Sequence, residues 1–541
     1  MSDTQKNAQD VTSQLWSMAN ELRGNMDASE FRNYILGFMF YRYLSDRQES
    51  FLNDQGLLDA EGNESLNDTY KREAAGDDLA DYLKEISSVL GYAISPNFTW
   101  ATIVEKIEND ELVASDFQDM FDEFNKNAVL NVNAENDFDG IFADINLSNS
   151  RLGNNTSTRA RALTNVVKMV NSFDYNDENG HDILGDIYEY LIAQFAGNSG
   201  KKAGEFYTPH EVSEVLAKIV TLNVANDDKP FSVYDPAMGS GSLLLTVGHE
   251  VNKGDVTGRV RYSGQELNTT TYNLGRMNLM MHGVKYDNMT LANGDSLESD
   301  WPDGADEHGV DHPRSFDAIV ENPPYSAHWD NQDNKMKDAR FKDYGALAPK
   351  TKADYAFLLH GLYHLNPEGT MAIVLPHGVL FRGAKEEKIR RSLLEKNQID
   401  AIIGMPAGLF YSTGIPTVVM VLKKQRENKD VLFIDASSNF EKGKNQNILS
   451  EEDIDRIIDT YKERKGVDKF AHVATLDEIK DNDFNLNIPR YVDTFEPEPE
   501  IDIKQVKADI ADLDTQIAEV EKEFAEMESQ LVETRGHDDD K

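Results

Sequence analysis

The stretch FSVYDPAMGSGS, residues 231–242, decides the fold of this chain. A short run of strand-forming residues ends at Asp235, and a glycine-rich turn follows that lets the backbone approach a ligand closely. The turn matches neither GxGxxG nor GxxxxGK(S/T), so it predicts neither a classical dinucleotide site nor an ATPase phosphate loop. An acidic strand end before such a turn favours a cationic ligand that carries an amino acid, such as S-adenosylmethionine.

Outward from this turn, strand-like runs alternate with helical stretches between about residues 155 and 440. The alternation predicts an α/β fold with a doubly wound, mostly parallel sheet. Such sheets bind ligands beyond the carboxyl ends of their strands, so a functional site is expected in the loops after the runs. The runs are FSVYDPA, RYSGQEL, MTLANGDS, FDAIVENPP, GTMAIVLPHG, QIDAIIGMPA and TVVMVLKK, and helices are expected at 269–282, 353–365 and 384–396.

Polar residues at two further strand ends suit the same ligand. The second run ends in Gln265-Glu266, where a carboxylate can accept hydrogen bonds from both hydroxyls of a ribose. The third ends in Asn293-Gly294-Asp295, and Asp295 can reach an adenine ring. Carboxylates are common at strand ends, so the order of these residues on successive strands carries more weight than either residue alone.

The motif Asn322-Pro323-Pro324-Tyr325 follows the apolar run FDAIV and is the most specific in the chain. Two prolines stop the strand and stiffen the turn, and the Pro323 carbonyl is free to accept a hydrogen bond. Asn322 Oδ1 and this carbonyl can accept both hydrogens of one exocyclic amine, which localises its lone pair for attack. Tyr325 offers a face on which an extruded base can stack. The motif therefore predicts methyl transfer to a conjugated amine.

Composition limits the chemistry. The 541 residues suggest about three domains. Lys and Arg number 54 against 96 Asp and Glu, and a net charge of −42 argues against unaided binding to nucleic acid. The absence of cysteine excludes disulfides, cysteine zinc sites and cytosine-C5 methylation through a thiolate. His360 and His364 are four residues apart, but without a third ligand they predict no metal site.

The sequence also bears on location. No stretch resembles a transmembrane span of about 18 or more apolar residues. The first residues, MSDTQKNAQD, contain no apolar signal region. A cytoplasmic protein without a membrane partner is therefore expected.

The two ends of the chain predict further helical parts. Apolar residues recur at helical intervals in FRNYILGFMFYRYLSDR, within a helix-rich segment up to about residue 155. Near the other end, 449–464 reads as a helix and EPEPE at 496–500 as a linker. Beyond it, apolar residues follow a heptad pattern, which favours a docking helix for another chain over an intramolecular helix pair. These residues are Ile503, Val506, Ile510, Leu513, Ile517, Val520, Phe524, Met527 and Leu531.

These motifs together resemble the modification (M) subunits of type I restriction–modification systems, which are adenine-N6 DNA methyltransferases. The order GEFYTP, DPAMGSGS, NPPY is that of the γ class of amino-methyltransferases. The likeness covers nearly the whole chain. It includes LGFMFYRYLSDR, GEFYTP (204–209), DPAMGSGS, NPPY, ADYAFLLH (353–360), LPHGVLFRG (375–383), LFYSTGIPTVVMVLKK (409–424) and NLNIPRYV (485–492).

The resemblance implies a domain plan and a cofactor site. The expected parts are an N-terminal α-helical domain (1–155), a Rossmann-like methyltransferase domain (156–445), a cap and linker (446–500) and a coiled-coil-type docking helix (501–535). S-adenosyl-L-methionine would be bound by residues of two motifs and two strand ends. These residues are Glu205, Phe206, Tyr207, Thr208, Pro209, His210, Asp235, Gly239, Ser240, Gly241, Ser242, Glu266 and Asp295.

It also implies a target-base site and partners. Asn322 to Tyr325 would hold a flipped adenine, with Phe410 or Tyr411 as the opposite aromatic wall. The partners would be a second copy of the chain, a specificity (S) subunit that reads the sequence, restriction (R) subunits and double-stranded DNA. Segments 331–352 and 382–396 each hold six Lys and Arg against three acidic residues, so both are candidates to face phosphates.

Three alternatives stay open at this point. Methyltransferases that act on protein glutamine also use NPPY, but they carry neither this N-terminal helical segment nor a terminal heptad helix. A non-catalytic binding module would not need NPPY and DPAMGSGS intact together. Cytosine-N4 methylation fits the same motif, because both amines are exocyclic and conjugated.

Overall fold

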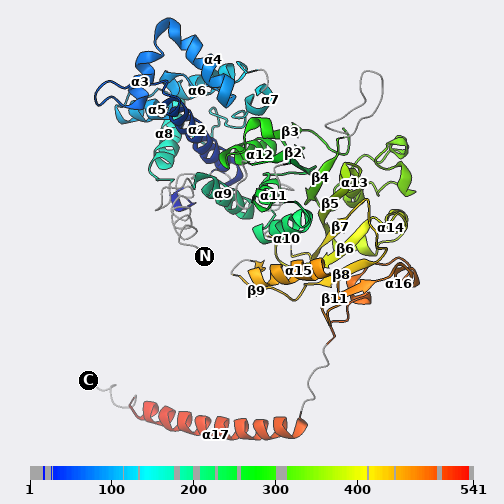
Figure 1. Cartoon of the computed structure of the whole chain (residues 1–541). Coiled ribbons are helices and arrows are strands. Elements are labelled where there is room, and N and C mark those ends of the chain that lie inside the picture. The colour runs from blue at the N-terminus through cyan, green and yellow to red at the C-terminus, as the bar shows by residue number, and fades with distance from the viewer. Residues whose placement is uncertain are drawn as a thin grey trace. The chain divides into compact units, whose positions relative to one another are not determined.

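The strands that lead into the predicted site residues lie side by side in the computed structural model of the chain (Figure 1). Residues 1–493 form one compact unit and residues 494–541 a second. Glu205, Phe206, Tyr207, Tyr411 and the predicted linker lie outside the described residues. The structure describes residues 16–18, 26, 28–113, 115–131, 134–175, 183–198, 208–225, 229–252, 258–299, 314–410, 414–443, 446–495 and 502–534.

A nine-stranded sheet, ordered β11-β8-β6-β7-β5-β4-β1-β2-β3 among the described residues, forms the centre of the larger unit. Strands β3, β2, β1, β4 and β5 run parallel, and so do β6 and β8. β7 is antiparallel to β5 and β6, and β11 to β8. The predicted mostly parallel sheet is confirmed. The strands are β1 (Phe231–Asp235), β2 (Val260–Glu266), β3 (Met289–Asn293), β4 (Phe316–Glu321), β5 (Leu365–Pro376), β6 (Ile399–Gly404), β7 (Thr417–Leu422), β8 (Val431–Asp435) and β11 (Ala471–Ala474), with a separate pair β9 (Glu441–Lys442) and β10 (Asn447–Ile448).

Helices cover both faces of the sheet, because side chains alternate along each strand. Val233 belongs to the apolar core on one face and Tyr234 to the core on the other. Figure 1 shows α10 to α12 on one side of the sheet and α13 and α14 on the other, and the predicted helices are all present. The first core includes α10 (His210–Thr221), α11 (Ser242–Asn252), α12 (Thr269–Met281) and α15 (Glu451–Glu463), and the second includes α13 (Asp354–Tyr363), α14 (Lys385–Glu395) and α16 (Leu476–Asp481).

The N-terminal part of this unit is helical, as predicted. Phe31, Tyr34, Ile35 and Phe38 bury one face of α2 (Ala28–Asp54) in the first core. The Tyr43 hydroxyl donates to the Met280 carbonyl at 2.7 Å and so connects α2 to α12. The surrounding helices are α3 (Leu66–Glu73), α4 (Leu79–Leu90), α5 (Trp100–Glu108), α6 (Asp116–Ala128), α7 (Glu135–Phe138), α8 (Thr156–Asn171) and α9 (Leu184–Asn198), with short 3-10 turns η1 (Gly76–Asp78) and η2 (Pro96–Phe98).

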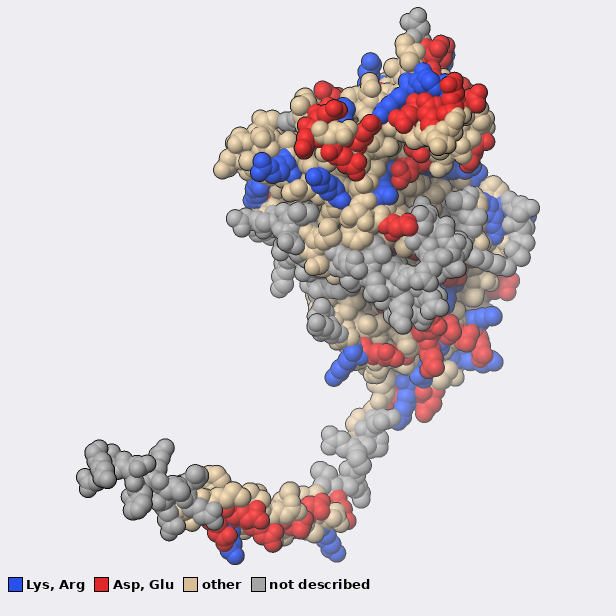
Figure 2. All heavy atoms as spheres, turned by 90° about the vertical axis from the view of Figure 1, so that its left-hand side faces the viewer, with Lys and Arg blue, Asp and Glu red and all other residues tan. Residues whose placement is uncertain are grey.

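Acidic side chains gather over these N-terminal helices. Figure 2 shows Asp and Glu grouped at the upper end of the unit, where α3, α4 and α6 lie, with fewer Lys and Arg among them. A surface of this charge repels phosphates. The acidic upper end of the helical part that Figure 2 shows is therefore a poor candidate for contact with DNA.

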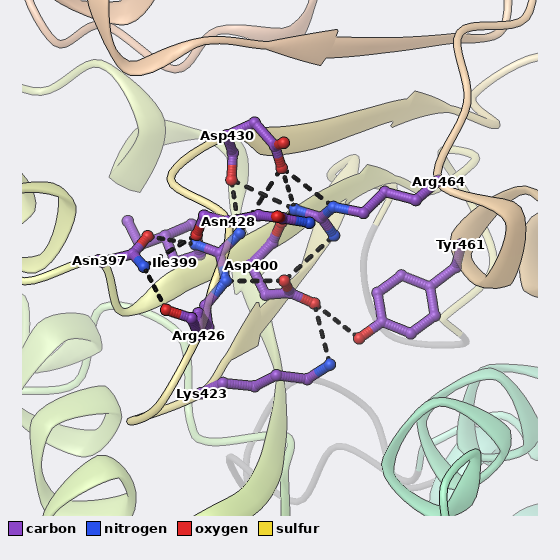
Figure 3. Close-up of polar contacts among 9 residues, drawn as sticks. All are labelled: Asn397, Ile399, Asp400, Lys423, Arg426, Asn428, Asp430, Tyr461 and Arg464. Carbon is purple, nitrogen blue, oxygen red and sulfur yellow. Dashed lines mark hydrogen bonds and ion pairs between the residues drawn. The ribbon is translucent and has the colours of Figure 1, made fainter.

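A buried ion cluster connects β6, β8 and α15 (Figure 3). Asp400, 4% exposed, accepts from the Tyr461 hydroxyl at 2.7 Å and forms ion pairs of 2.9–3.3 Å with Lys423, Arg426 and Arg464. Burial alone would raise the pKa of Asp400, but Lys423, Arg464 and Arg426 outweigh it and hold the pKa below the ordinary value. Asp400 lies near the amino end of β6, so the cluster is at the opposite edge of the sheet from the predicted site.

The second unit contains the long helix α17 (Ile503–Thr534). The apolar side chains of its heptad stripe are exposed from Ile503 to Met527, with exposed fractions between 42% at Val506 and 67% at Phe524. The side chain of Leu531 lies outside the described part. None of the helices that the structure describes is long and apolar enough to cross a membrane.

Candidate active site

The cofactor turn begins where β1 ends, at the fully buried Asp235. Asp235 Oδ1 accepts from the Ala237 N–H at 2.9 Å, whereas Oδ2 has no hydrogen-bond partner among the described residues. Burial and then the Glu266 carboxylate raise the pKa of Asp235 to about 8, against the opposing effect of the Ala237 bond. A buried carboxylate oxygen without a donor fits a cationic group of a ligand.

Two glycines shape the turn that follows. Gly239 and Gly241 have φ values of +54° and +77°, a region that side chains disfavour. A Cβ at Gly241 would lie 2.3 Å from Leu279 Cδ1, so α12 packs directly against this position. A Cβ at Gly239 would meet nothing within 4 Å, so this side of the turn is open to a ligand. Ser240 and Ser242 pair through their hydroxyls at 3.1 Å.

Carboxylates at the ends of β2 and β3 complete the predicted cofactor edge. Glu266 accepts from the Gly239 N–H at 3.2 Å and from the Asn268 N–H at 2.8 Å, so it fixes the glycine turn against β2. Asp295, two residues beyond β3, accepts from the Leu297 N–H at 2.9 Å. The three strands are neighbours, so three carboxylates line one edge of the sheet in the predicted order.

The amide of Asn322 is oriented from both ends. Its Nδ2 donates to Thr208 Oγ1 at 2.9 Å, and its Oδ1 accepts from the Tyr325 hydroxyl at 2.8 Å. Thr208 therefore contacts Asn322, the predicted catalytic residue. The sequence had suggested only a cofactor-binding role for Thr208. Pro209 and His210 follow as the N-cap and first residue of α10.

Two aromatic rings meet edge to face at this turn. The Tyr325 and Phe410 rings have centroids 6.2 Å apart and planes at 85°. Phe410 is 4% exposed, and burial raises the pKa of the Tyr325 hydroxyl far above its ordinary value, so this hydroxyl stays protonated as a donor. The assignment of Phe410 as the opposite wall for a base stays a prediction.

A single small cavity brings the two predicted halves of the site together. It has a volume of about 30 Å³ and reaches both the glycine turn and the Asn322 amide. The shared lining shows that the glycine turn and the Asn322 amide lie close together. The cavity is lined by Thr208, Asp235, Ala237, Met238, Gly239, Ser240, Ser242, Leu243 and Asn322.

Glu321, directly before Asn322, was missed by the sequence reasoning. It is fully buried, and neither carboxylate oxygen has a hydrogen-bond partner among the described residues. Burial, and then Asp235, raise its pKa well above that of an ordinary glutamate. The signal that was available is an acidic residue placed between an apolar strand and two prolines.

The two basic segments are only partly surface features. Lys335, Arg340 and Arg390 are buried, so the prediction that they face phosphates is wrong. Arg340 donates to the Ser296 carbonyl at 2.7 Å and to His360 Nδ1 at 3.0 Å, and Lys335 donates to the Leu297 carbonyl at 2.9 Å. These cations hold backbone of the chain itself. The exposed members, Lys337, Lys342, Lys350, Lys385, Lys388, Arg391 and Lys396, stay candidates.

Both histidines of α13 have partners in the core. His360 Nε2 lies 2.9 Å from the Tyr234 hydroxyl, and His364 Nδ1 lies 2.8 Å from the Arg314 carbonyl. Among the residues with a described position, no group of three or more His, Asp or Glu side chains could hold a metal ion. The pair therefore serves packing and hydrogen bonding.

Comparison with known proteins gives the family. Residues 179–500 match the family model for N-6 DNA methylase, and residues 11–170 match that for the HsdM N-terminal domain. The methylase subunit of the type I restriction enzyme MpnII from Mycoplasma pneumoniae is 37% identical over 514 residues, 92% of each chain. The chain belongs to the methylase subunits of type I restriction enzymes. Family and relatives identify this methylase subunit as a DNA adenine-N6 methyltransferase, which decides against the three alternatives.

Solved structures of relatives agree with the fold of this methylase subunit. The crystal structure of a type I restriction–modification methyltransferase subunit from Streptococcus thermophilus is 44% identical and superposes with a TM-score of 0.82. The alignment covers 90% of this methylase subunit and all of that chain. A structure from work on complex assembly of a type I restriction–modification system, at 17% identity and a TM-score of 0.56, shares the fold.

Proposed function

We propose that this chain methylates N6 of adenine in a specific DNA sequence, with S-adenosyl-L-methionine as donor and an S subunit to read the sequence. The observation that carries the proposal is the cavity shared by the glycine turn and Asn322. Gly239 of the predicted cofactor turn and Asn322, the predicted acceptor for the target amine, both line this cavity, which supports the proposal. The proposed action is on double-stranded DNA in the cytoplasm.

The residues at the strand ends fit this cofactor. Asp235 Oδ2, buried and without a donor among the described residues, suits the ammonium group of the methionine end. Glu266, whose carboxylate accepts from the Gly239 and Asn268 N–H groups at the end of β2, is the group proposed to accept from ribose hydroxyls. Asp295 stands at the next strand for the adenine ring. When bound, the cofactor supplies a methyl group already activated by a sulfonium, so no enzyme-bound methyl is required.

The residues of the second half activate and hold the base. Thr208 Oγ1 accepts a hydrogen bond from Asn322 Nδ2, which orients Asn322 Oδ1 toward the NPPY turn. Asn322 Oδ1 retains a second lone pair beside its bond from Tyr325, so it can accept from N6 together with the Pro323 carbonyl. An adenine extruded from the duplex would stack on Tyr325, with Phe410 as the opposite wall.

Partners follow from charge and from α17. At a net charge of −42, the chain needs a partner to supply basic surface for DNA. The exposed stripe of α17 is suited to pack on a helix of the S subunit. The full assembly proposed here has two copies of this chain, one S subunit and added R subunits.

The test is methyl incorporation from labelled S-adenosyl-L-methionine into DNA, by the chain with and without its S subunit. We expect incorporation only with S, and N6-methyladenine as the sole modified nucleoside by mass spectrometry. N4-methylcytosine in the DNA, or label recovered in protein, would contradict the proposed substrate. Equal incorporation without S would contradict the division of labour.

A further inference from the structure

Residues 326–331, which follow the NPPY motif, are hydrogen-bonded to the segment that leads into α13. The bonds join two stretches of irregular backbone, so each fixes the other in place. The start of α13 therefore sets the position of the chain just beyond Tyr325. The four bonds run from Trp329 N to Lys350 O, Trp329 Nε1 to Pro349 O, Asn331 Nδ2 to Ala348 O and Ala353 N to Ala327 O, at 3.0–3.1 Å.

Ser326 joins the motif to this segment in a disfavoured conformation. Its φ is +53°, in the left-handed region where a side chain meets steric hindrance. Its N–H donates to Asp354 Oδ1 at 2.7 Å, at the short end of the range for such bonds and assisted by the carboxylate charge. The bond to Asp354 therefore opposes relaxation of Ser326 to a commoner conformation.

Asp354 is itself firmly held. Its side chain has no exposed surface, and its second oxygen accepts from Arg382 NH1 at 3.1 Å. Arg382 also binds Glu386 at 2.8 Å, and its carbonyl accepts from the buried Arg390 at 2.9 Å. Asp354 is the first residue of α13, where the helix dipole favours a negative charge. Both carboxylate oxygens thus have fixed partners, one of them in the backbone next to Tyr325.

We propose that Asp354 is a positioning residue for methyl transfer, which holds Ser326 in its left-handed conformation and thereby places Tyr325 and Asn322 for the target base. The inference rests on the proposed function. Residues 327–331 are held by the hydrogen bonds described above. The conformation of Ser326 therefore sets the position of the adjoining Tyr325 backbone. The Tyr325 hydroxyl in turn binds Asn322 Oδ1, so a displaced Tyr325 disturbs the stacking face and the acceptor together.

The experiment compares Asp354→Ala and Asp354→Asn in the complex with the S subunit. We expect Asp354→Ala to lower kcat on the order of 10- to 100-fold, because small misplacement of reacting groups is costly. The KM values for DNA and S-adenosyl-L-methionine should stay within a few-fold. Asp354→Asn keeps an oxygen for the Ser326 N–H but loses the ion pair with Arg382, so it should recover only part of kcat, to about the level of Arg382→Gln. The fluorescence of 2-aminopurine at the target position, which reports stacking of an extruded base, should change most for Ala and less for Asn.

Asp400→Asn is the matched control, a buried aspartate with arginine partners at the other edge of the sheet. It should keep wild-type kcat per folded molecule even if its melting temperature falls. Should Asp354→Ala not fold, the part-exposed Arg382→Gln replaces it in the test and should lower kcat. If Arg382 instead contacted a DNA phosphate, this variant would raise the KM for DNA. Wild-type kcat and 2-aminopurine fluorescence in Asp354→Ala would overturn the inference about Asp354 and leave the proposed function intact. Wild-type transfer by Asn322→Ala as well would overturn the proposed function.

Discussion

Asn322 depends on two neighbours for its orientation. Without Thr208 on its nitrogen and Tyr325 on its oxygen, the amide could rotate and present a donor to an amine that needs an acceptor. An acceptor already fixed in place needs no reorganisation when positive charge develops on the attacking amine. In the proposed reaction, this arrangement would favour the transition state of transfer over the mere binding of a base.

Asn322→Ala should lower methyl transfer at least about 100-fold, since one of two acceptors on the target amine is lost. The affinity for S-adenosyl-L-methionine should stay within a few-fold. Single-turnover transfer to DNA by the complex with S measures the first value, and calorimetry the second. Asn366→Ala is a suitable control, because its amide binds Asp317 at the amino end of β5, and it should transfer normally. Near-normal transfer by Asn322→Ala would remove the base-activation role.

Asp235 trades stability for ligand binding. Its pKa is about 8 when folded and 3.8 in the ordinary case, so between these values the folded state holds a proton that the unfolded state lacks. A rise in pH from about 4 to about 8 therefore destabilises the ligand-free chain, with no further loss above that range. Asp235→Asn should be more stable than the wild type at pH 7, with the difference vanishing near pH 4.

Urea unfolding at several pH values measures this difference. The same variant should lose most affinity for S-adenosyl-L-methionine, because a neutral amide cannot complement an ammonium group in a buried site. Equal free energies of unfolding for the variant and the wild type at every pH tested would mean that folding does not raise the pKa of Asp235. Unchanged cofactor affinity would place the ammonium group elsewhere.

At the scale of elements, the Asp400 cluster adds ion pairs to the apolar core that β6, β8 and α15 share. Asp400→Ala should lower the free energy of unfolding by about 3–5 kcal/mol, because it removes the carboxylate that pairs with buried Arg426, with Arg464 and with Lys423 and leaves Asp430 to neutralise the two arginines alone. Urea unfolding at neutral pH tests this. Asp459→Ala, on an exposed position of α15, should stay within about 0.5 kcal/mol of the wild type.

The pH dependence of this effect has a defined sign. The pKa of Asp400 is lowered by folding, so its contribution is present above the unfolded pKa and is lost as the pH falls through the folded one. Wild type and Asp400→Ala should therefore approach each other in acid. A constant difference down to the acid transition would show that packing, not charge, supplies the stability.

Most strands of the sheet and several helices that flank it could be predicted from sequence, because strands and helices differ in the periodicity of their apolar residues. The run VLFID of β8 and the edge strand β11 were not predicted, and β11 exists through its antiparallel pairing with β8. The direction of β7 between β5 and β6 was equally out of reach, since a run of apolar residues marks a strand but not its sense. Pairing is a tertiary property.

The candidate site was likewise predictable only in part from the sequence. Asp235, Glu266 and Asn322 lie directly at strand ends, where sequence alone marks them. The roles of Thr208 and Asp354 depend on segments that meet only in the fold. Arg390 could have been found, because it lies with Ile389 and Leu393 on the buried face of α14, where helical periodicity places it in the core.

At the scale of the whole molecule, the catalytic unit and the heptad stripe are separate. Burial of each exposed apolar side chain of α17 is worth about 1.5–3 kcal/mol, and much of the sum is offset by the costs of association. Deletion of residues 501–541 should leave cofactor binding intact and prevent stable assembly with S. Methylation should fall with assembly, since a chain at −42 binds DNA poorly alone.

Co-purification with S and calorimetry with S-adenosyl-L-methionine measure the two outcomes. Ile517→Asp, which puts a charge into the stripe, should act like the deletion. Thr515→Asp, on the opposite side of the helix, is the control and should assemble normally. Assembly of the truncated chain at full yield would mean that the helix packs on this chain itself.

The separation of α17 from the sheet also bears on how such chains can evolve. The stripe belongs to residues 494–541, whereas the transfer residues belong to the other compact unit. A recombination event near residue 494 would exchange the whole stripe without touching a catalytic side chain. With the stripe docking on the S subunit as proposed, a lineage of such genes could change its recognition partner, and with it the DNA sequence that it marks, in one inherited step while the chemistry passes on unaltered.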